Sequence, residues 1–180
     1  MNRPALLLLA AIYAPFSGAQ ETLDHRFEAG NLTVTVTGED SEYAETRSYQ
    51  VVVSNELRVL SRLDVNRDGL VTGAWMADLD RDGAFEVIVA TGQLDGEDRG
   101  AVDIHEWRDF RFDSTAAAAL PPAAQRRYRG NDQFDVENGR LRRAFPAFNG
   151  ENSGDQGVPT GELVLFEYDY PANRWIGVSP

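Results

Sequence analysis

Four acidic residues between positions 78 and 86 have the types and spacing needed to bind a metal ion. Asp78, Asp80 and Asp82 alternate along the chain, Gly83 follows them, and Glu86 stands at the ninth position when Asp78 is counted as the first. Alternate acids on a tight turn direct their oxygens toward one point, and a glycine at the sixth position permits the sharp bend of oxygen-ligand calcium loops. The spacing therefore indicates a candidate Ca²⁺ site made of Asp78, Asp80, Asp82 and Glu86.

The same residues also fit a turn without metal. A helical EF-hand loop requires Glu at its twelfth position, but this chain has Val89 there and strand-like residues on both sides, so the loop is not an EF-hand. A calcium loop in a β-hairpin takes its last carboxylate from the position of Glu86, as in integrin-like β-propeller repeats. The alternative is an acidic hairpin turn held by Asx-type hydrogen bonds. A structural ion is favoured over a catalytic one, because no nucleophile or base is recognisable nearby.

A second acidic segment repeats the pattern less completely. Asp64, Asn66 and Asp68 alternate and are followed by a glycine, but the ninth and twelfth positions are Thr72 and Trp75. Because the closing carboxylates are missing, we interpret this segment as a plain turn.

Catalysis has little support in the sequence. The chain has no cysteine, and none of its serines lies in a Gly-x-Ser-x-Gly elbow. His25 and His105 are the only histidines, the residue type that serves most readily as a base near neutral pH; His105 falls in an expected strand and His25 in the β-rich front. A histidine in such a strand is more often a surface or hydrogen-bonded residue than a catalyst. No pair among the 29 acids stands out as a glycosidase pair, so we expect no enzymatic activity.

Alternation of apolar and polar residues dominates the rest of the chain and is typical of β-strands. Asn138-Gly139, between two such runs, is a strong signal for a two-residue hairpin turn. In the segment 113–128, Ser114 and the following alanines favour a short helix that Pro121 and Pro122 would end. The pattern predicts an antiparallel β-sandwich of roughly eight to ten strands with one short helix. The expected strand runs are 32–38, 48–53, 57–63, 85–91, 101–107, 134–145, 162–168 and 173–178.

The first 19 residues have the features of a secretory signal peptide. Arg3 precedes an apolar run over 5–14, and small residues lead up to Ala19, after which we expect cleavage. The apolar run is too short to span a membrane. We therefore expect a periplasmic protein with a single domain over residues 20–180.

The charge is strongly negative and unevenly distributed. The formal net charge is −12, and residues 20–113 contain 21 acids against nine arginines, whereas residues 114–180 contain eight against seven. This balance argues against nucleic acid and favours a basic secreted protein as partner, although acidity also simply keeps an exported protein soluble. We expect no membrane partner, and the sequence is compatible with a homodimer. We expect a local group of arginines to pair with acids of residues 20–113, the acidic front of the chain. These arginines are 126, 127, 129, 140, 142 and 143.

Three stretches of the chain share features with a known family. They are "VTGAWMADLDRDGAFEVIVAT" (71–91), "YRGNDQFDVENGRLRRAFPAF" (128–148) and "GDQGVPTGELVLFEYDYPANRW" (154–175). Together they resemble the periplasmic inhibitor family of invertebrate-type lysozymes. With the signal peptide and the β-rich front, the resemblance covers nearly all of the expected mature chain. It implies a β-sandwich without catalysis, in which a loop with a Ser-Gly-x-x-Tyr arrangement enters the lysozyme cleft.

The chain departs from that family at the loop itself. The segment that follows the strand ending at Thr91 has glycines but neither serine nor tyrosine, and Arg99 stands where the tyrosine is expected. The resemblance therefore transfers the fold and the position of the loop, but not the inhibitory residues. The candidate partner-binding residues are Gly92, Gln93, Asp95, Gly96, Glu97, Asp98, Arg99 and Gly100.

Overall fold

The computed structural model describes residues 23–38, 47–67, 69–92, 99–149 and 157–179. Among these residues the chain is almost entirely β, with twelve strands in three four-stranded antiparallel sheets and one short helix. The expected all-β, antiparallel, sandwich-like fold with one short helix is confirmed, although the strands outnumber the eight to ten expected. The expected signal peptide lies outside the described residues.

Each sheet is a meander whose neighbouring strands follow one another in sequence. The N-terminal sheet contains β1 (Leu23–Ala29), β2 (Leu32–Gly38), β3 (Arg47–Asn55) and β4 (Val59–Arg67). The central sheet contains β5 (Leu70–Ala77), β6 (Phe85–Gly92), β7 (Gly100–Arg108) and β8 (Arg111–Ala116). The C-terminal sheet contains β9 (Gln133–Glu137), β10 (Arg140–Asn149), β11 (Val158–Asp169) and β12 (Arg174–Val178), and helix α1 (Pro122–Gln125) precedes it.

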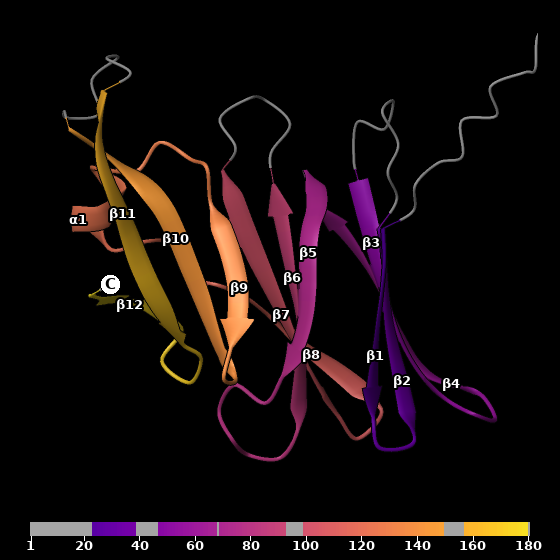
Figure 1. Ribbon diagram of the computed structural model, residues 1–180. Helices are drawn as coiled ribbons and strands as arrows, with labels where there is room; N and C mark the ends of the chain where they lie inside the picture. The colour runs from indigo at the N-terminus through magenta and orange to yellow at the C-terminus, as the bar shows by residue number, and fades with distance from the viewer. Residues whose placement is uncertain (1–22, 39–46, 68, 93–98, 150–156, 180) are drawn as a thin grey trace, which may run out of the picture.

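The central sheet lies between the other two (Figure 1). Side chains of β6 alternate between the two interfaces: Val87 and Val89 pack against the N-terminal sheet, and Ile88 and Ala90 pack against the C-terminal sheet. Residues 86–91 are all buried as a result. A strand covered on both faces is expected to be apolar throughout, which explains why "FEVIVAT" lacks the strict alternation of "LTVTVTG" in β2.

The two interfaces have different cores. The one between the N-terminal and central sheets is rich in valine, and fully burying each such side chain contributes about 1.5–3 kcal/mol. The one between the central and C-terminal sheets contains larger side chains, among them Ile104, Leu141, Phe145, Phe166 and Trp175. Both cores stabilise β6, so β6 is held from two sides.

The helix expectation was wrong in position. Ser114 lies in β8 instead of capping a helix, and Pro121 and Pro122 begin α1 instead of ending it. Proline suits the first helical position, because the N–H group it lacks would have no partner within the helix there. No helix among the described residues is long and apolar enough to cross a membrane.

The turn signals were mostly informative. Asn138 and Gly139 both have positive φ, 53° and 71°, and Glu137 pairs with Arg140, so these residues form the expected two-residue hairpin between β9 and β10. The second acidic segment differs from expectation, because Asp64 and Asn66 lie within β4 and the chain then passes from one sheet to the next.

Candidate functional site

The candidate residues from the sequence lie at the two ends of β6. The acidic turn, defined as residues 78–84, connects β5 to β6, and the loop 92–100 connects β6 to β7. An eight-residue strand spans about 26 Å, so the acidic turn and the pair Gly92–Gly100, from which the loop starts, lie near opposite ends of the central sheet (Figure 1).

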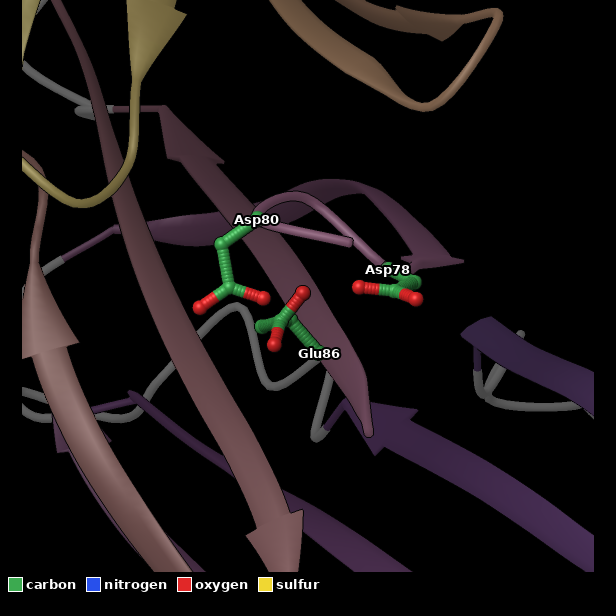
Figure 2. A group of neighbouring side chains, drawn as sticks. All are labelled: Asp78, Asp80 and Glu86. Carbon is green, nitrogen blue, oxygen red and sulfur yellow. The ribbon is translucent and has the colours of Figure 1, made fainter. Parts of the chain in front are cut away.

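Three of the four candidate metal ligands come together at the acidic turn. Asp78, Asp80 and Glu86 each place one carboxylate oxygen within 4.8 Å of the others. Figure 2 shows the Glu86 carboxylate between those of Asp80 and Asp78. Glu86 reaches this position from within β6, where it pairs with Ala77 of β5, the residue directly before Asp78.

The backbone of the turn is held by the Asx-type hydrogen bonds that the sequence suggested. The carboxylate of Asp78 accepts hydrogen bonds from the N–H groups of Asp82 (3.1 Å) and Gly83 (3.0 Å), and Asp82 accepts one from Ala84 N–H (2.8 Å). Arg81 and Gly83 have positive φ, 65° and 91°. Each carboxylate oxygen has a second lone pair, so these bonds leave room for a cation.

Asp82 is not part of the group. Its carboxylate forms an ion pair with Arg108 of β7, which also contacts Glu106 at 2.8 Å. The hydrogen bond from Ala84 N–H and the Arg108 guanidinium lower the pKa of Asp82. The structure therefore brings together three of the four candidate ligands and leaves the fourth with an arginine.

Glu86 is the most unusual of these acids, because it is fully buried. Burial raises the pKa of Glu86 to about 7, against the effect of a hydrogen bond from Leu79 N–H, and the charges of Asp80, Glu106 and Asp78 raise it further. Oε2 accepts that bond at 2.6 Å, whereas Oε1 has no hydrogen-bond partner among the described residues.

The loop 92–100 starts and ends at a paired position. Gly92 and Gly100 form the last pair of the β6–β7 ladder. Gln93, Asp95, Gly96, Glu97 and Asp98 lie outside the described residues, so only Gly92, Arg99 and Gly100 of the candidate set are placed. A Cβ at Gly100 would lie 2.4 Å from the Phe134 ring, so the close approach of β7 to β9 requires glycine here.

A buried ion pair holds the end of this loop that leads into β7, its descending end, and no pattern in the sequence indicates this pair. Asp132 accepts a hydrogen bond from Gly100 N–H (2.7 Å) and another from the Tyr128 hydroxyl. It also pairs with Arg143 at 2.7 Å, with side chains 1% and 8% exposed. The guanidinium lies 5.0–5.7 Å from three aromatic ring centres, those of Tyr128, Phe134 and Trp175. Such cation–π contacts add to the pair.

Three other arginines of that local group have ion-pair partners outside the acidic front. Arg127, Arg140 and Arg142 instead pair with acids of their own half of the chain, at Glu162, Glu167, Asp135 and Glu137. For these three arginines the expectation was wrong, because the C-terminal sheet supplies nearer carboxylates. These arginines therefore do not offset the negative charge of residues 20–113.

A hollow of about 450 Å³ opens beside the descending end of the loop. It lies between the central and C-terminal sheets and is lined in part by Arg99, Gly100, Tyr128, Phe134 and Trp175. Aromatic faces with a few polar groups are typical of surfaces that receive a ligand or a partner side chain.

The second histidine forms part of a buried polar network between the N-terminal and central sheets. Ser114 donates to His105 Nδ1 (2.8 Å), His105 Nε2–H donates to the Tyr49 oxygen (2.7 Å), and Tyr49 donates to Asp103 (3.0 Å). Arg67 completes the network by forming an ion pair with Asp103 at 2.5 Å. Burial lowers the pKa of His105 to about 4, so this histidine is neutral at pH 7 and its two ring nitrogens both have partners. Its arrangement fits the expected hydrogen-bonded role.

Comparisons with known proteins return no match among family models, curated proteins or solved structures. The resemblance to lysozyme inhibitors therefore rests on the three sequence stretches, and the chemistry of the site has to indicate the function.

Proposed function

We propose that this protein is an exported, non-catalytic binding protein that presents the loop 92–100 to the cleft of a lysozyme or of another basic secreted protein. The observation that supports this best is the attachment of the loop. It connects β6 and β7, the two middle strands of the central sheet, and residues 86–91 leading into it are all buried. Asp132 and Arg143 hold its descending end through Gly100. Because the two end residues of the loop, Gly92 and Gly100, are already paired in the sheet, they need no further ordering on binding, which favours affinity.

The charge of the loop supports a basic partner. Asp95, Glu97 and Asp98 place three carboxylates in a segment of nine residues, against the single cation of Arg99. Complementary charge raises the association rate and selects among partners more than it raises raw affinity. The absence of the serine and tyrosine of the inhibitor family means that these acids, and the hollow beside Arg99, would have to provide the contacts.

The test is inhibition of invertebrate-type, chicken-type and goose-type lysozymes by the purified protein. We expect inhibition of at least one class at micromolar protein, and loss of that inhibition when residues 93–98 are replaced by glycine and serine at equal length. Absence of inhibition of all three classes would refute the lysozyme version of the proposal.

A further inference from the structure

We infer that Asp78, Asp80 and Glu86 form a calcium site at the end of β6 remote from the partner-binding loop, and that Ca²⁺ recruits Asp82 from Arg108 as a fourth carboxylate ligand. This inference is independent of the proposed lysozyme partner. It gives a role to the acidic turn, which the proposed function leaves unused.

The observation that points to a cation is the free oxygen of Glu86. Its side chain is fully buried among two other carboxylates, and Oε1 has no hydrogen-bond partner among the described residues. A buried carboxylate oxygen without a partner is costly, and buried charges are normally paired or coordinate a metal. None of the ion pairs among the described residues reaches Asp78, Asp80 or Glu86.

The ligand set fits calcium better than magnesium, because Mg²⁺ usually keeps several waters and binds only one or two carboxylates, whereas Ca²⁺ accepts several protein oxygens. Oxygens on opposite sides of one Ca²⁺ lie about 4.6–5.2 Å apart, since each Ca–O bond is about 2.3–2.6 Å long. For Mg²⁺, with bonds of about 2.0–2.1 Å, the same separation is at most about 4.2 Å. The three carboxylates lie within 4.8 Å of one another, which is no more than the largest oxygen–oxygen separation across one Ca²⁺. Gly83, at the sixth position of the loop, supplies the bend with a φ of 91°.

Arg108 competes with Ca²⁺ for the carboxylate of Asp82, the fourth ligand. It holds the Asp82 carboxylate in an exposed ion pair, with side chains 54% and 33% exposed. Exposed pairs of this kind contribute only about 0–1 kcal/mol, whereas a divalent ion beside three carboxylates attracts a fourth strongly. Asp82 already shares the turn backbone with the other ligands, because its N–H bonds to Asp78 and Asp80.

The experiment is a calcium titration of the chelator-stripped protein, followed by calorimetry and by thermal melting. We expect one ion per chain and a rise in Tm of roughly 5–11 °C when calcium reaches a hundred times Kd, with a smaller rise for Mg²⁺. No heat and no change in Tm at 5 mM calcium would overturn the site, and an equal response to Mg²⁺ would overturn the assignment to calcium.

Variants locate the site. Glu86→Gln keeps an acceptor for Leu79 N–H and removes one of three clustered negative charges, so we expect a higher Tm without calcium and loss of the calcium shift. Arg108→Gln should tighten calcium binding by up to about fivefold, because Asp82 is released. The matched control Asp64→Asn changes the exposed acid of the second acidic segment and should respond to calcium as the wild type does. A calcium shift that survives Glu86→Gln would place the ion elsewhere and overturn the inference.

Discussion

The buried pair of Asp132 and Arg143 provides a stringent test of how the base of the loop is held. Asp132→Asn removes the negative charge while keeping the size of the side chain, and it leaves Arg143 as an uncompensated charge with a side chain only 8% exposed. Breaking a buried ion pair in this way costs about 3–5 kcal/mol, although the aromatic rings around Arg143 offset part of the loss. For a domain of this size we expect Tm to fall by roughly 6–20 °C.

The assay is urea denaturation, with Asp135→Asn as the matched control. Asp135 also pairs with an arginine of β10, at 2.7 Å, but its side chain is 55% exposed and that of Arg142 is 28% exposed. The control should lose no more than about 1 kcal/mol. Equal losses in the two variants, or a loss below 1 kcal/mol in Asp132→Asn, would refute the reasoning that burial of this pair fixes the loop.

Three further predictions concern the core, a turn and pH. Ile88→Ala should cost about 2–5 kcal/mol in urea denaturation, because a fully buried side chain between two sheets leaves a cavity; a loss under 1 kcal/mol would contradict the layered core. Gly139→Ala should cost about 1–2 kcal/mol, because its φ of 71° is unfavourable for residues with a Cβ, whereas Gly177→Ala, a control in β12 without positive φ, should cost less. The folded pKa of His105, about 4, lies below the ordinary 6.5, so the unfolded chain binds a proton that the folded chain does not. Stability should therefore fall by roughly 3 kcal/mol as pH drops from 6.5 to 4, and His105→Gln should lose this part of the pH dependence.

The sequence identified those features that depend on local pattern. The run 85–91 predicted a strand, and Asn138-Gly139 predicted the hairpin turn between β9 and β10, because both signals come from residues adjacent in the chain. The strand β5 was missed because its register shifts between Val71 and Gly73, which breaks the regular alternation. The strand β8 was assigned to a helix because alanines follow it, although the helix begins only at the prolines.

The site was predictable in part for the same reason. Asp78, Asp80 and Glu86 lie close in sequence and close in space, so their spacing was enough to group them. Asp82 could not be separated from them, because its partner Arg108 lies 26 residues away on β7. Asp132 and Arg143 gave no signal, since nothing in an acid and an arginine eleven residues apart indicates that both are buried beside Gly100.

The most direct test of the proposed function is equilibrium binding of the three lysozyme classes to two charge-matched triple variants. One variant carries Asp95→Asn, Glu97→Gln and Asp98→Asn in the loop, and the other carries Asp24→Asn, Asp64→Asn and Asp113→Asn at exposed positions elsewhere. Both variants raise the net charge by three. We predict that only the loop variant loses binding to the lysozyme that the wild type binds. Equal binding by the two variants, or no binding by the wild type, would contradict the proposal that the loop 92–100 engages this partner.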